Sequence, residues 1–350
     1  MTSRPAAADL VLFAHALLLA AGMEPDKATA VAEVLVEGDL LGHTTHGLAL
    51  LAPYLGELER GAMTARGEPR LIADFPAAVT WDGGRLPGPW LARRAIDLAL
   101  ERARGNGSCA VSIRRSHHLA CLAAYLQRAT DQGFVILLTC SDPNVASVAP
   151  FGGRREVFTP NPVAAGWPTA GDPVLLDASM SITTNALTKR LHGERRRFPG
   201  EWALDASGQP TDDPAALFTV PPGTLLPTGG IDHGHKGYAG ALLVEALTAG
   251  LAGHGRADPG EGWGATVLVQ VFQPACFAGT EEFVRQMEWI ARACRVNPPR
   301  PGVEAVRLPG EAGLRRRRTQ LAEGVSLHPS IAPALRPWAE KLQVPVCPGL

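Results

Sequence analysis

The 350-residue sequence lacks several motifs that would place it in a common protein class. Its six cysteines are scattered without a CxxC pair, which excludes the commonest zinc and redox spacings. HExxH and P-loop motifs are absent as well. The formal net charge of −1 gives no overall attraction for nucleic acid or acidic lipid. We therefore expect reduced thiols in the cytoplasm, no bound metal and no nucleic-acid partner.

The sequence also lacks an apolar run of the roughly 20 residues that a membrane-spanning helix needs. The nearest candidate is LVLFAHALLLAAGM at 10–23, which begins after Asp9 and is interrupted by His15. A secretory signal peptide is the alternative for this segment. Its apolar residues recur at helical spacing, however, which favours a helix facing the core. We expect no membrane partner.

A glycine-rich dinucleotide motif in its proper context is missing too. GxGxxG should stand between a strand and a helix, but GNGS at 105–108 follows a helical pattern. If the protein binds a nucleotide, it does so on a scaffold other than the Rossmann fold.

What the sequence does contain is an ordinary globular composition, with 46% hydrophobic and 19% charged residues. Helical patterns cover 7–22, 25–41, 47–61, 90–107, 117–131, 236–253, 279–294 and the tail from 311. Strand patterns cover 108–113, 134–140, 173–182 and 265–272. The ends are therefore helical and the middle is mixed. This predicts an α/β (α+β) protein in which residues 1–75 with 296–350 form a helical domain and 76–295 form a central sheet domain.

Two polar clusters contain pairs of histidines. In GHTTHG at 42–47, Thr and His before a glycine are typical of a helix cap, and a catalytic site is the alternative. In RRSHHLACLAAY at 114–125, His117 and His118 stand where a strand pattern gives way to a helical one. Backbone N–H groups at such a junction suit an anion, and an imidazole there is placed for proton transfer. A cap explains this second pair equally well.

Two further clusters contain other ionisable groups. Asp177 lies in the apolar run PVLLDAS, so its buried carboxylate needs a histidine, a helix N-terminus or a ligand hydroxyl as a partner. Lys236 follows His233 and His235 in a glycine-rich loop that leads into a helix. This lysine either binds an anionic ligand or extends into solvent.

Taken together, the clusters resemble the malate/L-lactate dehydrogenase family of the non-Rossmann type. That family includes ureidoglycolate, sulfolactate and diketogulonate dehydrogenases and Δ1-piperideine-2-carboxylate reductases. The similar segments follow the family order through most of the chain: THGLALLAPY (45–54), DGGRLPGPWLARRAIDLALERA (82–103), SHHLACLAAY (116–125), APFGGRREVFTPNP (149–162), LLDASMS (175–181), GEWALDASGQPTDDP (200–214), LLPTGG (225–230) with HKGY (235–238), and VRLPGEAG (306–313).

The resemblance implies a mostly antiparallel central sheet domain that binds NAD or NADP, a helical domain built from both termini, and a homodimer. It also implies a dehydrogenase or reductase that transfers a hydride between nicotinamide and a 2-oxo acid-like carbonyl or a cyclic imine. A histidine moves the accompanying proton.

The resemblance carries site residues over as well. It implies that His46 and His118 are catalytic and share acid–base and orienting roles. The substrate-binding residues are then Thr45, Leu50, Tyr54 and Lys236. The cofactor-binding residues are His118, Leu119, Ala120, Cys121, Leu122, Asn161, Leu176, Asp177, Ala178, Lys236, Pro309, Gly310 and Glu311.

The chain departs from the family pattern at several of these positions. The family arginine that suits a substrate carboxylate is Leu50 here, which removes a charge-assisted bond worth about 1.5–3 kcal/mol. Further departures occur at Leu119, Ala120, Cys140, 184–186 and Leu187. We therefore expect malate and lactate to bind poorly. A relative that has lost hydride transfer and acts as a non-redox enzyme or binding protein is one alternative, and a metal hydrolase that uses the histidines is another.

Overall fold

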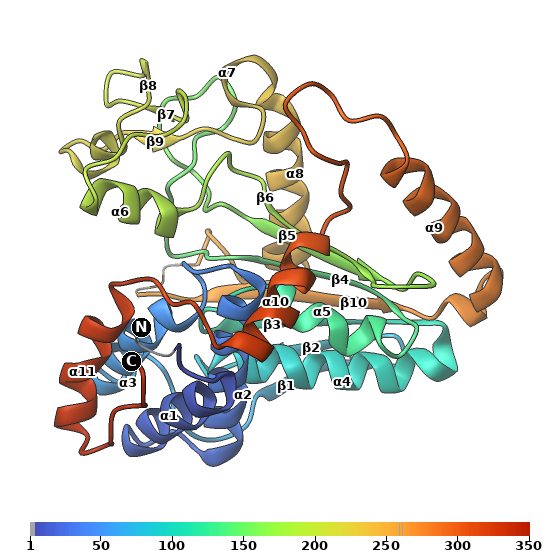
Figure 1. Cartoon of the computed structure of the whole chain (residues 1–350), viewed down its shortest axis with the longest axis horizontal. Coiled ribbons are helices and arrows are strands. Elements are labelled where there is room, and N and C mark those ends of the chain that lie inside the picture. The colour runs from blue at the N-terminus through green and yellow to red at the C-terminus, as the bar shows by residue number, and fades with distance from the viewer. Residues whose placement is uncertain (1–3, 259, 261) are drawn as a thin grey trace.

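The computed structural model describes residues 4–258, 260 and 262–350. A seven-stranded sheet, ordered β1-β2-β3-β10-β4-β5-β6, crosses the middle of the molecule (Figure 1). Its strands are β1 (Arg70–Phe75), β2 (Ala78–Asp82), β3 (Ser108–Ser116), β4 (Val135–Ser141), β5 (Pro162–Trp167), β6 (Val174–Ser179) and β10 (Ala265–Phe272). Only β2 and β3 pair in parallel among these neighbours. The predicted mixed fold with a mostly antiparallel sheet is confirmed.

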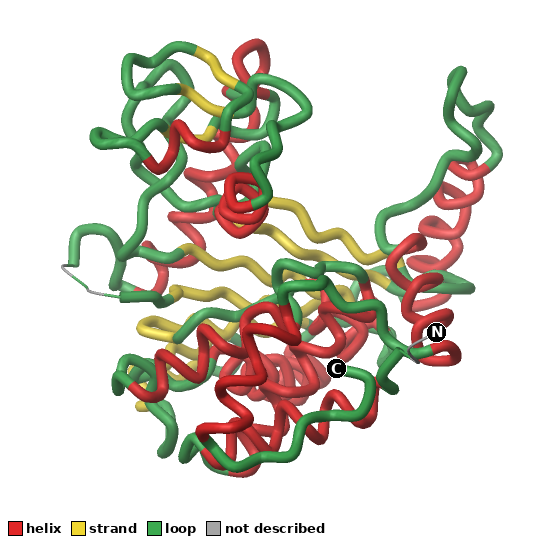
Figure 2. Tube along the Cα trace, turned by 60° about the vertical axis from the view of Figure 1, so that its left-hand side comes forward, coloured by secondary structure: helices red, strands yellow, loops and turns green. Residues whose placement is uncertain are grey.

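Helices surround the sheet, and a small sheet ordered β8-β7-β9 lies apart from it (Figures 1 and 2). The helices are α1 (Ala7–Ala20), α2 (Pro25–Leu41), η1 (Leu48–Leu50), α3 (Leu51–Glu59), α4 (Gly88–Asn106), α5 (Ala123–Thr130), α6 (Asn185–Gly193), η2 (Pro214–Phe218), α7 (Gly230–His233), α8 (His235–Glu245), η3 (Ala246–Gly250), η4 (Pro274–Cys276), α9 (Thr280–Arg295), α10 (Glu311–Glu323) and α11 (Ile331–Lys341). The small strands are β7 (Ala203–Leu204), β8 (Pro210–Thr211) and β9 (Thr224–Leu225).

Helix α2, which leads into the site, has both of its ends set by local sequence. Pro25 occupies its first turn, where the missing N–H costs nothing. Gly42 follows its last residue at φ 93°, a conformation that favours glycine. The N–H of His43 then donates to the carbonyl of Gly38 at 2.8 Å. His43 thus helps to cap the C-terminus of α2 through its backbone, one of the two interpretations that the sequence left open.

One hydrophobic core joins the terminal helices to the sheet. Leu35 of α2, Leu91 of α4 and Val269 of β10 are fully buried in it. Helix α10 packs on α2, and α11 packs on α3, so the C-terminal segment returns to the N-terminal helices (Figure 1). A second, smaller core lies among residues 148–241. The exact domain boundaries, 1–75 with 296–350 and 76–295, stay a prediction.

Several element boundaries differ from the sequence prediction. The predicted helix over 117–131 is wrong at its start, because 117–122 form a loop and α5 begins at Ala123. Ala120 in that loop has φ 61°, which no helix accommodates. The pattern at 236–253 becomes α8 followed by the π-helical turn η3. The sequence analysis missed β1, β2 and β5 because their side chains lack a strong apolar alternation.

Candidate functional site

Two histidines from separate segments lie face to face in the structure. His46 belongs to the turn between α2 and η1, and His118 belongs to the loop between β3 and α5. Their ring centroids are 6.0 Å apart with an interplanar angle of 25°. The ring of Trp263 lies 4.3 Å from that of His118, centroid to centroid. The fold thus assembles an aromatic cluster around two of the predicted catalytic side chains.

The protein holds His118 through one ring nitrogen. The backbone N–H of Ala120 donates to Nδ1 at 3.2 Å, and the hydroxyl of Tyr54 lies 2.8 Å from the same atom. Both contacts are made to Nδ1, and the same Tyr54 hydroxyl also lies 3.2 Å from the carbonyl oxygen of His118. Burial raises the pKa of Tyr54 well above its usual value, which keeps that hydroxyl a donor. Nε2 is therefore the nitrogen through which His118 can exchange a proton with a ligand.

Burial also keeps both site histidines neutral. It lowers the pKa of His118 well below its usual value, with the nearby histidines adding to the effect. It lowers the pKa of His46 to about 4, and the charges of His43 and Arg190 act in the same direction. The hydroxyl of Thr45 lies 2.9 Å from Nδ1 of His46. At neutral pH the site therefore presents two imidazoles in the form that accepts a proton.

Asp39 of α2 holds the turn that carries His46. Its Oδ2 accepts a hydrogen bond from the N–H of Leu48 at 2.7 Å, at the start of η1. A Cβ on Gly47 would lie 2.4 Å from this carboxylate, so only glycine fits there. Oδ1 is buried without a hydrogen-bond partner. Burial raises the pKa of Asp39 to about 7.

The segments predicted to contact the cofactor meet beside this turn. Asp177 of β6 accepts a hydrogen bond from the N–H of Ala123, the first residue of α5, at 2.8 Å. Burial raises the pKa of Asp177, and the nearby His43 opposes that rise. Asp177 therefore has two of the three kinds of partner that the sequence left open, a helix N-terminus and a histidine. One atom each of His43, Cys121 and Asp177 lie within 4.8 Å of one another. That no metal binds here stays a prediction.

The C-terminal motif at 309–311 contacts the same strand, β6. The N–H of Leu175 in β6 donates to the carbonyl of Pro309 at 3.1 Å. A Cβ on Gly310 would lie 2.8 Å from the side chain of Leu175, so PGE at 309–311 fits closely against β6. Leu176, Asp177 and Ala178 follow directly along this strand. Three segments far apart in sequence, 118–122, 176–178 and 309–311, thus lie around β6 and α5.

A model of the malate/L-lactate dehydrogenase family matches residues 6–336. The chain belongs to this family. It is 33% identical over 340 residues to the L-lactate dehydrogenase of Cupriavidus necator, which covers 95% of this chain and 96% of the relative. It is 30% identical over 321 residues to the ureidoglycolate dehydrogenase (NAD(+)) of Escherichia coli K12, with 89% and 88% covered. Among solved structures, Δ1-piperideine-2-carboxylate reductase from Pseudomonas syringae pv. tomato superposes with a TM-score of 0.84 at 28% identity, covering 97% of this chain and all of that chain.

Membership makes this dehydrogenase an oxidoreductase that uses NAD or NADP. The structure fits such a cofactor at the segments around β6. Among the described residues no side chain caps the start of α10, where Gly310 precedes Glu311, and the N–H groups of a first helical turn suit a phosphate. Residues 118–122 and 176–178, which lie near the same strand, would contact the cofactor bound there. When bound, the nicotinamide supplies or accepts the hydride.

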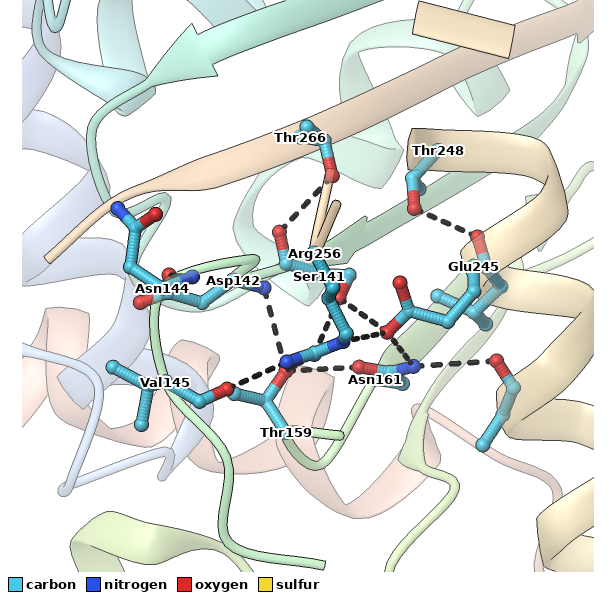
Figure 3. Close-up of polar contacts among 12 residues, drawn as sticks. Ser141, Asp142, Asn144, Val145, Thr159, Asn161, Glu245, Thr248, Arg256 and Thr266 are labelled. Atoms are coloured by element: carbon cyan, nitrogen blue, oxygen red, sulfur yellow. Dashed lines mark hydrogen bonds and ion pairs between the residues drawn. The ribbon is translucent and has the colours of Figure 1, made fainter. Parts of the chain in front are cut away.

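Two predicted ligand-binding residues, Asn161 and Lys236, lie apart from the segments around β6 and α5. Asn161 is fully buried, and its amide bonds to Thr159, to Glu245 and to the carbonyl of Ala241 (Figure 3). A contact between Asn161 and the cofactor would therefore have to use its backbone. Lys236 is exposed at the start of α8. Its role in binding substrate or cofactor stays a prediction.

The sequence analysis missed three residues that shape the site. Trp263 stands between two glycines, a local context that could have indicated an aromatic residue on a functional loop. Asp39 and Arg190 lie within regular helical patterns, and nothing local distinguishes them. Both residues act through contacts with the turn that carries His46, which only the folded chain brings beside them.

The pH dependence of stability tests the burial of Asp39. Its pKa is about 7 in the folded protein and near 3.8 in the unfolded chain, so its contribution is lost as pH rises from about 4 to about 7 and then levels off. Asp39→Asn keeps an acceptor for Leu48 but does not titrate. Between about pH 5 and pH 7, we expect the urea midpoint of the wild type to fall relative to that of this variant. A constant difference across this range would show that Asp39 titrates normally.

Proposed function

We propose that this dehydrogenase interconverts a 2-oxo acid-like carbonyl or cyclic imine with its hydroxy or amino acid, and that His118 moves the proton. The observation that carries the proposal is the state of His118. Nδ1 is bound by Ala120 and Tyr54, which leaves Nε2 for the substrate. The largely buried His46, stacked on His118, orients the reacting group together with Thr45.

The wall of the substrate site near His46 differs from that expected for malate or lactate. Leu50 is only 7% exposed and packs in the main core, so it offers no cation for a carboxylate. Leu119 and Ala120, where the chain also departs from the family pattern, are buried in the same core. The absence of a cation at position 50 supports a specialised substrate other than malate or lactate.

Binding and turnover with both cofactors test the proposed function. We expect NADH or NADPH to raise the thermal midpoint, because a ligand that binds only the folded state stabilises it. We expect absorbance at the nicotinamide band to fall when aliphatic and aromatic 2-oxo acids or cyclic imine acids are added, with malate and lactate the poorest substrates in the reverse direction. Binding of neither cofactor would favour the alternative in which hydride transfer has been lost.

We also infer that the protein is a cytoplasmic homodimer. Exposed apolar residues on α8 and α9 support this inference, among them Leu242, Leu243, Trp289 and Ile290, which are 46–64% exposed. Only Ala291 of α9 is buried, and a helix gains most of its stability from packing. No helix among the described residues is long and apolar enough to cross a membrane. Sedimentation equilibrium should give twice the chain mass of 36.9 kDa, and a monomer would contradict the inference.

A further inference from the structure

Arg190 of α6 reaches the turn that carries His46. One terminal nitrogen of its guanidinium donates to Oγ1 of Thr44 at 2.8 Å, and the other donates to the carbonyl of Thr44 at 2.7 Å. The turn is compact, because the N–H of His46 donates to the carbonyl of His43 at 2.8 Å. Arg190 therefore places a full positive charge beside the site histidines, from an element that lies 146 residues away in sequence.

Only some of the hydrogen-bond donors of the Arg190 guanidinium have partners. A guanidinium has five N–H donors, and the contacts with Thr44 use two of them on neutral oxygens. No carboxylate lies within 4.0 Å of Arg190 among residues 4–258, 260 and 262–350. Glu194, the acid nearest to it along α6, is engaged by Arg196 and His328. Partial burial lowers the pKa of Arg190, against the opposing charges of Glu194 and Asp39.

A half-buried cation without an ion pair, next to a catalytic histidine, is suited to an anionic ligand. Three of its donors remain, and Nε–H with one terminal N–H forms a fork that matches a carboxylate. The family cation expected after His46 is replaced by Leu50, so the site lacks the usual group for this task. Arg190 approaches the same turn from α6 and can supply the missing charge.

We propose that Arg190 binds the carboxylate of the substrate in this enzyme and so replaces the arginine that Leu50 has displaced. This inference rests on the proposed function, and it defines the substrate as an anion: a 2-oxo acid or a cyclic imine acid. Arg190 is thus a specificity-determining residue, and α6 becomes part of the substrate site.

The test compares a charged substrate with its uncharged analogue. Arg190→Met removes the charge and keeps much of the apolar stem, whereas Lys189→Met removes a charge from an exposed neighbouring position of α6. KM and kcat are measured with NADH or NADPH for a panel of 2-oxo acids and for their methyl esters. We expect Arg190→Met to raise KM for the acid by about 10- to 100-fold, with a much smaller change for the ester. Lys189→Met should change neither.

The possible results separate a failure of the Arg190 proposal from unfolding of the variant and from a failure of the proposed function. If Arg190→Met impairs acid and ester equally, or impairs neither, Arg190 serves only to hold Thr44 and the proposal is wrong. The dissociation constant of NADH, measured by fluorescence, should be unchanged in Arg190→Met, which separates loss of the substrate charge from general unfolding. If the wild type turns over no acid and no ester, the proposed function has failed instead.

Discussion

His118→Asn is expected to lower kcat by about 10²- to 10⁴-fold, the usual contribution of a positioned acid or base. Asparagine can place an acceptor near the position of Nδ1, so the N–H of Ala120 and the hydroxyl of Tyr54 keep a partner. It lacks the equivalent of Nε2, which is the atom assigned to proton exchange. Steady-state kinetics with saturating cofactor measure the loss, and the binding of NADH should persist.

The pH profile separates proton transfer from mere positioning. Because burial holds the pKa of His118 below its usual value, the protonated form that reduction requires becomes rarer as pH rises. We therefore expect kcat/KM for reduction to fall about tenfold per pH unit between about pH 6 and pH 8 in the wild type, and to lose this slope in His118→Asn.

His117 and His46 provide the comparisons for this prediction. His117 is fully buried, and its Nε2 lies 3.2 Å from a carboxylate oxygen of Glu57. His117→Gln preserves a donor for Glu57 and should keep most of the activity. If His46→Asn loses both kcat and the pH slope while His118→Asn keeps them, His46 is the proton-transfer residue and our assignment is wrong.

Gly88→Ala is expected to lower both kcat and stability, although Gly88 itself does not contact the substrate. Gly88 begins α4, and a Cβ there would lie 2.4 Å from the carbonyl oxygens of both His117 and His118. Backbone atoms cannot rotate away, so the loop that carries His118 must shift. Overpacking of this kind costs about 1–3 kcal/mol, and a displacement of about 1 Å at a reacting group costs about 100-fold in rate. Urea unfolding and kcat measure the two effects.

Gly105 in the same helix is the matched control. A Cβ at Gly105 meets no atom within 4 Å, and alanine favours a helix over glycine by about 1 kcal/mol. Gly105→Ala should therefore leave kcat unchanged and leave the protein equally stable or slightly more stable. A Gly88→Ala enzyme with normal kcat would show that the His118 loop tolerates displacement, which would contradict the positioning argument.

Local sequence determined those features that depend on neighbouring residues. Helix periodicity, Pro25 and Gly42 gave the extent of α2, and the backbone of His43 helps to cap it, one of the two interpretations left open. The apolar surroundings of Asp177 required a buried partner, which the structure supplies in Ala123. The order of motifs was enough to identify the family and its NAD(P)-dependent chemistry.

Tertiary structure decided the features that depend on contacts across the chain. The loop at 117–122 carries apolar residues at helical spacing, but Ala120 is held at φ 61°, a backbone conformation that no helix accommodates. Which nitrogen of His118 is available follows from Tyr54, which lies 64 residues away. The charge of Arg190 reaches His46 only because α6 folds onto Thr44. A sequence pattern indicates the secondary structure and burial of a residue. The protonation state of a histidine and the group that an arginine contacts depend on partners that only the folded chain brings together.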